Sequence, residues 1–162
     1  RDPRFSGATG FDGDGLSTCD QALVKDGVLQ SHLHDLYSAK RCSARFGQPV
    51  ASTAMSGGPF AMAFAPGTSS FAQLVGSQPN LLMIDRFSGN TDPVKGDFSG
   101  VAKSSRFLQR GEDRGSVTET MIAGNFFAIA DAVLAVSKEV EIVGGGFVSP
   151  YVLVDGVSVT GG

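Results

Sequence analysis

Glycine and proline interrupt this sequence so often that most of its ordered segments must be short. The 162-residue chain contains 22 Gly and 7 Pro. Glycine favours turns because it adopts positive φ without strain, and proline favours them because its ring fixes φ. Short apolar stretches lie between these positions and are typical of strands. The sequence therefore predicts a series of short strands joined by turns, with antiparallel pairing dominant.

The segment 126–137 has the strongest helical pattern in the chain. Its apolar residues recur at spacings of three and four, which places them on one face of a helix. Asn125 directly precedes the segment and has a side chain typical of an N-cap. We therefore expect a helix over about 126–137. Its apolar face consists of Phe126, Ile129, Ala130, Val133 and Leu134.

A second, shorter helix is expected over about 69–76, with Thr68 or Ser69 as its N-cap and Gly76 at its end. These two helices and the many short strands together predict an α+β fold. We expect the β-structure to be mainly antiparallel, and either barrel-like or divided into two sheets.

Both histidines of the chain follow a strong hairpin signal. Within 21–37, the dipeptide Asp26-Gly27 separates two apolar runs, as in a two-residue β-hairpin loop. If the second run is a strand, His32 and His34 point to the same face of it, because side chains alternate along a strand. Two histidines on one face are a geometry that could chelate a metal ion.

Other features of the sequence weigh against a metal site there. A zinc site needs three or four protein ligands. Asp35 would point to the opposite strand face, and Cys42 lies beyond the cations Lys40 and Arg41. The chain contains no His-Glu-x-x-His motif and no paired Cys-x-x-Cys motif. We therefore predict no metal site in this chain and interpret the histidines as part of a half-exposed strand. The sequence also has no Gly-x-Ser-x-Gly motif, so we predict no catalytic residue, although a Ser-His-Asp triad that uses His32 or His34 stays open.

The loop Asp12-Gly13-Asp14-Gly15 resembles the start of a calcium-binding loop. However, the third acidic position and the closing Glu of such a loop are missing. We interpret this segment as a turn.

Charge and composition exclude some function classes. The formal net charge is −3, whereas a nucleic-acid-binding protein needs a broad basic face. No apolar run reaches membrane-spanning length. Cys19 and Cys42 can form a disulfide only if the fold brings them close together. The chain begins with Arg1 rather than Met, which indicates a fragment or a processed product. The main cluster of cations consists of Lys103, Arg106, Arg110 and Arg114, interrupted by Glu112 and Asp113.

Several motifs, in order along the chain, resemble the C-terminal domain of the TldD/PmbA family, peptidase-related proteins once called modulators of DNA gyrase. The resemblance spans nearly the whole chain and is greatest for the PmbA (TldE) branch. It implies that 1–162 is one TldD/PmbA-type C-terminal domain, and that the N-terminal domain of the parent chain is absent from this fragment. The motifs are "FDGDGLST" (11–18), "KDGVLQSHLHDLYSAKR" (25–41), "GTSSFAQLV" (67–75), "VKGDFSG" (94–100), "RGE" (110–112) and "VTETMIAGNFFAIADAV" (117–133).

The resemblance also bears on zinc. TldD-type members have a Cys near the end that completes a zinc site, and Gly144 stands at the corresponding place here. The family's other ligands come from a His-Glu-x-x-x-His helix upstream of this domain. His32 and His34 match no ligand of the family. The resemblance therefore implies zinc only in a TldD-like partner, where the metal lowers the pKa of bound water for attack on a peptide carbonyl.

By this resemblance, the chain is the chamber-forming domain of a TldE-like, non-catalytic subunit of a zinc-dependent peptidase complex. Its expected partners are a TldD-like subunit or a second copy of itself, together with a peptide substrate, in the cytoplasm. An extended substrate could pair with strands of the chamber. We expect Asp97 and Ser99 to face the peptide, because they interrupt an apolar strand. The alternative for these two residues is a turn-capping Asp and an exposed Ser.

A function of another class is also open. The chain could be a stand-alone homodimeric binding or assembly domain with no proteolytic role. Its 12 Phe residues favour this alternative if several of them are exposed, because exposed apolar patches mark interfaces.

Overall fold

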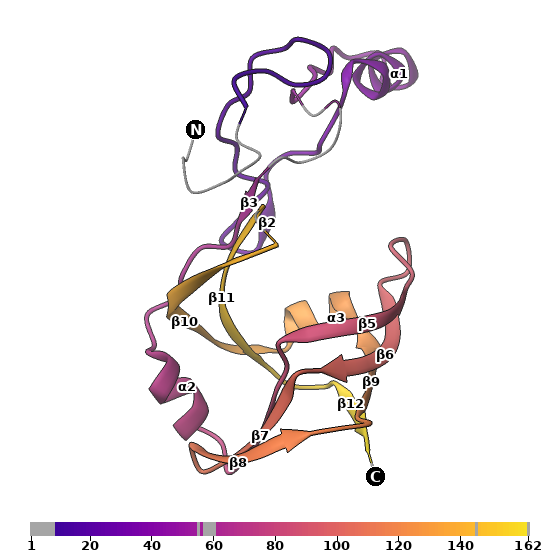
Figure 1. Cartoon of the computed structure of the whole chain (residues 1–162). Coiled ribbons are helices and arrows are strands. Elements are labelled where there is room, and N and C mark those ends of the chain that lie inside the picture. Colours follow the sequence, from indigo (N-terminus) through magenta and orange to yellow (C-terminus); the bar gives the residue numbers. More distant parts are fainter. Residues whose placement is uncertain (1–8, 55, 57–60, 145, 162) are drawn as a thin grey trace. The chain divides into compact units, whose positions relative to one another are not determined.

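A computed structural model of the chain describes residues 9–54, 56, 61–144 and 146–161 (Figure 1). The chain divides into two compact units. The first unit consists of Arg1–Ala63 and Ile142–Val148. The second unit consists of Phe64–Glu141 and Ser149–Gly162. The two units are described separately below.

The first unit begins with the expected hairpin. Strands β1 (Val24–Lys25) and β2 (Val28–Leu29) pair antiparallel. Asp26 and Gly27 have φ values of 52° and 75°, as a type I′ turn requires, and Gly tolerates that conformation without strain. The hairpin prediction is therefore confirmed, although each strand is only two residues long.

The helix α1 (Leu36–Phe46) follows directly and was not expected from the sequence. The carboxylate of Asp35 accepts a hydrogen bond from the Ser38 backbone N–H over 2.6 Å, which makes Asp35 the N-cap. His32 and His34 precede this cap and lie outside any strand. The expectation that they share a strand face is therefore wrong. Ala39 is the only buried residue of this helix.

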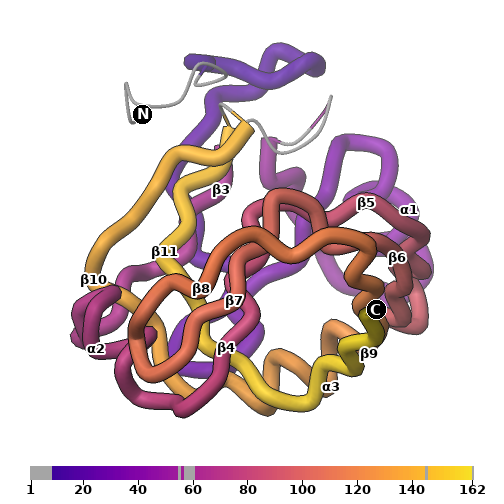
Figure 2. Tube along the Cα trace, turned by 60° about the horizontal axis from the view of Figure 1, so that its bottom comes forward, coloured from indigo at the N-terminus to yellow at the C-terminus, as the bar shows by residue number. Residues whose placement is uncertain are grey.

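The second unit contains a four-stranded antiparallel sheet and a three-stranded antiparallel sheet. The strand order is β12-β9-β6-β5 in the first and β4-β7-β8 in the second, where the three strands lie side by side (Figure 2). The strands of the four-stranded sheet are β5 (Arg86–Thr91), β6 (Asp97–Lys103), β9 (Met121–Asn125) and β12 (Ser158–Thr160). Those of the three-stranded sheet are β4 (Asn80–Met83), β7 (Ser105–Gln109) and β8 (Glu112–Val117).

Two long strands contribute residues to both units. They are β10 (Val133–Val143) and β11 (Phe147–Val154). In the first unit, the start of β11 pairs in parallel with β3 (Met62–Ala63). The sheet orders show no closed barrel among the described strands. The predicted α+β class with mainly antiparallel sheets is confirmed.

The two expected helices both form, with different limits. Helix α2 (Phe71–Gly76) is capped by Ser70 rather than by Thr68 or Ser69. Helix α3 (Phe126–Asp131) begins after Asn125 as expected, but it ends at Asp131 and the chain continues as β10. The prediction of helix over 133–137 is therefore wrong, and the described residues form three helices rather than two. The pairing of β10 with β11 overrides the local helical pattern.

Residues with positive φ separate consecutive strands. Ser104 has a φ of 54° and lies between β6 and β7. Glu119 has a φ of 55° and lies between the end of β8 and the start of β9.

The core of the second unit lies on one face of the four-stranded sheet. Phe98 and Ala102 of β6 and Ile122 of β9 are buried there. The rings of Phe87 and Phe98 pack edge to face with centroids 5.7 Å apart, a preferred geometry for an aromatic pair. Partly buried residues that pack against this core are Leu82, Phe87, Ile129 and Val157.

Candidate functional site

The two predicted peptide-binding residues lie on the face of β6 opposite the core. Side chains alternate along a strand, and Phe98 and Ala102 point into the core. Asp97, Ser99 and Lys103 are exposed on the other side. The alternation of the strand therefore explains why these residues are polar: they face away from the core.

The strand register extends this surface over the whole four-stranded sheet. Residues directly opposite in an antiparallel pair project to the same face. We call this surface the exposed face. Its members are Arg86, Ser88 and Asn90 of β5; Asp97, Ser99, Val101 and Lys103 of β6; Met121, Ala123 and Asn125 of β9; and Ser158 and Thr160 of β12.

At one end of the exposed face, Asp97 takes part in the cap of α3. The Asn125 side-chain amide donates hydrogen bonds to Asp97 Oδ1 and to the Lys95 carbonyl, each over 2.8 Å. Asn125 Oδ1 accepts hydrogen bonds from the backbone N–H groups of Phe127 and Ala128. Asp97 thus accepts a hydrogen bond from the amide that caps the helix. The turn before β6 is capped by Asp92, whose Oδ1 accepts from the Val94 and Lys95 N–H groups.

Ser99 lies near the middle of the exposed face. Its register partners are Asn90 on β5 and Ala123 on β9. Ser99 is exposed, and its hydroxyl has no hydrogen-bond partner within the part of the chain that the structure describes. The hydroxyl is therefore available to a ligand.

The position of β6 limits how it can bind a peptide. The strand pairs with β5 on one side and with β9 on the other. Its backbone groups are consequently used within the sheet, and only its side chains can contact a ligand. Within this sheet as described, backbone pairing with an added strand is open only at the outer edges of β5 and β12.

At the other end of the exposed face, two cations lie directly opposite each other. Arg86 of β5 is the register partner of Lys103 of β6, and both are exposed. No carboxylate of the described residues lies within ion-pair distance of either cation. The sequence alone does not show that these two residues are neighbours, because strand register depends on tertiary structure.

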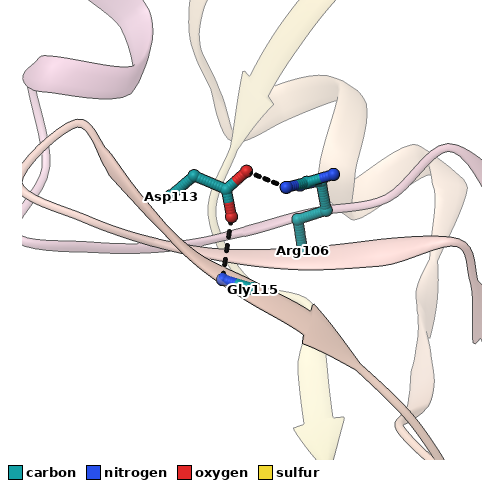
Figure 3. Close-up of polar contacts among 3 residues, drawn as sticks. All are labelled: Arg106, Asp113 and Gly115. Atoms are coloured by element: carbon teal, nitrogen blue, oxygen red, sulfur yellow. Dashed lines mark hydrogen bonds and ion pairs between the residues drawn. The ribbon is translucent and has the colours of Figure 1, made fainter.

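Two other cations of the predicted basic cluster form ion pairs with neighbouring carboxylates. Arg106 forms an ion pair with Asp113, whose other oxygen accepts a hydrogen bond from the Gly115 N–H over 2.8 Å (Figure 3). The hydrogen bond from Arg106 contributes most to holding the pKa of Asp113 below its usual value. Arg114 pairs with Glu112 over 3.0 Å. The cluster is therefore a solvated, mixed-charge surface and not a basic face.

The histidines lie close to each other, with ring centroids 6.2 Å apart. The described residues contain no group of three His, Cys, Asp or Glu side chains that could hold a metal ion. Zinc requires at least three protein ligands, so the residues near His32 and His34 do not fit it.

Cys19 and Cys42 are both free thiols. Gly144 lies in the turn after β10 with a φ of 60° and offers no donor atom.

The Asp12 carboxylate is used by hydrogen bonds within its own loop and to Ser56. It accepts hydrogen bonds from the backbone N–H groups of Asp14, Leu16 and Ser56 over 2.8–3.0 Å. Burial acts to raise the pKa of Asp12, but these hydrogen bonds outweigh it and hold the pKa below the usual value. The segment is therefore a turn, as predicted from the sequence.

None of the described helices is long and apolar enough to cross a membrane.

The fold and the sequence motifs identify the class of protein. Residues 1–161 match the model of the PmbA/TldA metallopeptidase C-terminal domain. The chain therefore belongs to this family, and the resemblance inferred from its motifs is confirmed.

Two curated relatives support the PmbA branch. The chain is 30% identical over 138 residues to a protein named metalloprotease PmbA homolog from Haemophilus influenzae, which covers 83% of this chain and 29% of the relative. It is 27% identical over 135 residues to metalloprotease PmbA from Escherichia coli O157:H7, covering 83% of this chain and 28% of the relative. The chain thus spans less than a third of the length of these relatives.

Solved structures share the fold. A proposed modulator of DNA gyrase from Thermotoga maritima superimposes with a TM-score of 0.85 at 26% identity, over 99% of this chain and 37% of that one. TldE from Thermococcus kodakarensis gives a TM-score of 0.79 at 24% identity, over 94% of this chain and 36% of that one. At that identity, the second likeness shows the fold alone.

Proposed function

We propose that this chain is the chamber-forming C-terminal domain of a PmbA/TldE-like, non-catalytic subunit in a zinc-dependent peptidase complex. The observation that carries the proposal is the match of residues 1–161 to the metallopeptidase C-terminal domain. The non-catalytic role rests on Gly144, which has no side chain to act as a ligand at the place where TldD-type members have a Cys. In this proposal, zinc belongs to a TldD-like partner in the cytoplasm.

In this role, the exposed face of the four-stranded sheet contacts the peptide. Asp97 and Ser99 are exposed on β6, and the Ser99 hydroxyl is free to donate or accept a hydrogen bond within the described part of the chain. Because β6 is a central strand, these contacts are made by side chains. Asp97 Oδ1 already accepts from Asn125, so Ser99 is the better candidate of the two.

A peptide-hydrolysis assay tests the division of roles. The full-length protein that contains this chain is assayed alone, its TldD-like partner is assayed alone, and the two are assayed together. We expect no hydrolysis by the first protein alone and full hydrolysis by the mixture. Equal hydrolysis by the first protein with and without the partner would reject the non-catalytic role.

One observation favours the alternative of a homodimeric binding domain. Several described phenylalanines are exposed, and exposed apolar groups mark interfaces. Sedimentation of the full-length protein, alone and with a TldD-like partner, separates the two proposals. A homodimer that does not exchange with the partner favours the alternative. The exposed phenylalanines are Phe11, Phe46, Phe64, Phe126, Phe127 and Phe147.

A further inference from the structure

The cationic pair Arg86 and Lys103 has an arrangement that costs stability in the free protein. The two residues are register partners in an antiparallel pair, where Cβ atoms lie about 5 Å apart and like charges are destabilising. No carboxylate of the described residues pairs with either one. An anion bound between the two side chains would be attracted to both cations, and these attractions would offset the repulsion between them.

We propose that Arg86 and Lys103 bind a carboxylate of a peptide lying on the exposed face. The guanidinium group of Arg can hold both oxygens of a carboxylate, and the Lys ammonium adds a further charged donor. The proposal rests on the proposed function, because it assigns one end of the same peptide-contacting surface. It goes beyond that function by naming the charge and the position of one group of the ligand.

The rest of the exposed face agrees with a peptide. On the exposed face, the pair that follows the two cations is Ser88 with Val101, and the pair after that is Asn90 with Ser99. These side chains are uncharged, so one carboxylate followed by a neutral chain matches them. A nucleic acid, with a charge on every nucleotide, would instead need cations along the whole surface.

The dimensions fit a short extended peptide. The seven residues of β6 span about 20 Å at the usual rise of a strand, and Ser99 lies about 13 Å from Lys103. A peptide that runs along β6 with its carboxylate at Lys103 therefore passes over Ser99 about four residues before that carboxylate. Asp97 lies at the far end, away from the bound anion.

Calorimetric titration with three short peptides of Ala and Ser tests the proposal on the full-length protein. One peptide has a free C-terminus, the second ends in an amide, and the third is an amide with Glu as its last residue. We expect the free acid to bind about tenfold more tightly than the plain amide, as charge-assisted hydrogen bonds imply. Tight binding of the Glu peptide as well would show that a side-chain carboxylate suffices; tight binding of the free acid alone would assign the site to the C-terminus.

Two variants connect this preference to the cations. Arg86→Gln combined with Lys103→Gln is expected to reduce binding of the free acid to the level of the amide, without changing binding of the amide. Arg86→Glu replaces the like-charge pair by an opposite-charge pair, so its unfolding midpoint should rise while the preference for the free acid is lost. A gain in stability with a loss of binding excludes misfolding as the cause. Lys25→Gln, which removes an exposed cation on β1, is the control and should change neither property.

The possible failures are distinguishable. Equal binding of acid and amide by the wild-type protein, or a preference that survives in Arg86→Glu, overturns the anion site while leaving a peptide-contacting face intact. If none of the three peptides binds, the peptide-contacting role itself fails, and the anion site fails with it.

Discussion

Gly89 of β5 and Gly100 of β6 lie directly opposite each other in the four-stranded sheet. A Cβ atom on Gly100 would lie 2.5 Å from Gly89 Cα and 2.9 Å from Cε2 of Phe87. The two strands and the Phe87 ring therefore approach each other more closely than any residue with a side chain would permit. This contact lies on the core side of the sheet whose other side is the exposed face.

We predict that Gly100→Ala destabilises the protein by about 1–3 kcal/mol, the usual cost of overpacking. The added methyl group would meet backbone atoms, which cannot rotate away. Gly76→Ala is the matched control, because a Cβ there meets no atom within 4 Å and Ala favours a helix. Urea-unfolding midpoints of the two variants should differ clearly; equal midpoints would contradict the close approach.

Asn125→Ala should destabilise the protein by about 1 kcal/mol, a typical value for loss of an N-cap. The variant removes the acceptor for two backbone N–H groups of α3 and the donor to Asp97. Asn90→Ala removes an exposed Asn from the same face of the sheet and should have little effect. Thermal unfolding followed by circular dichroism checks both; similar shifts in the two variants would contradict the capping role.

Two fully buried serines should respond in opposite directions to replacement by alanine. Ser105 is 1% exposed and its hydroxyl has no hydrogen-bond partner among the described residues, so Ser105→Ala should stabilise the protein by about 1 kcal/mol. Ser137 is 0% exposed. Its hydroxyl donates to the Glu139 carbonyl and accepts from the Tyr151 N–H. Ser137→Ala should destabilise by about 1–3 kcal/mol, because it leaves buried partners unsatisfied. Chemical unfolding of both variants would refute this contrast if the shifts had the same sign.

The Tyr151 phenol should lose its proton at an unusually high pH. Its hydroxyl donates a hydrogen bond to Glu141, and this bond, with burial and the negative charges of Glu141 and Asp85, raises the pKa of Tyr151 to about 12. The folded-state pKa therefore lies above the usual phenol value of 10.0. The associated stability is therefore fully present below about pH 10 and is lost as the pH rises towards 12.

A near-ultraviolet titration of phenolate absorbance checks this shift. The difference between wild type and Tyr151→Phe should contain one phenol with a pKa near 12. Glu141→Gln should move this component to lower pH, because it removes the charged acceptor. A difference curve centred near pH 10 would contradict the hydrogen bond to Glu141.

Local signals in the sequence were reliable where neighbouring residues determine the conformation. The Asp26-Gly27 turn and the Asn125 cap were both predicted, since each depends on backbone preferences and short-range hydrogen bonds. Helix α1 was missed because the hairpin signal over 21–37 favoured a strand that would include its first residues. The segment 133–137 was misassigned because its pairing with β11 lies outside the local pattern.

The candidate site was predictable only in part. Asp97 and Ser99 were selected as polar residues in an apolar strand, and the structure places both on the exposed face. Arg86 and Lys103 are 17 positions apart in the sequence, and only the strand register shows that they are neighbours. The hydrogen bond between Asn125 and Asp97 likewise joins two different strands.

The central claim, that this chain belongs to a subunit that does not carry the metal, is tested most directly by measuring zinc in separated subunits. The full-length protein and the proposed TldD-like partner are purified together, separated without chelator, and analysed for zinc per polypeptide. We expect zinc with the partner and none above background with the protein containing this chain, and hydrolysis to be restored only when the two are recombined. Stoichiometric zinc retained by the protein that contains this chain, with hydrolysis by that protein alone and its loss on adding a chelator, would contradict the account.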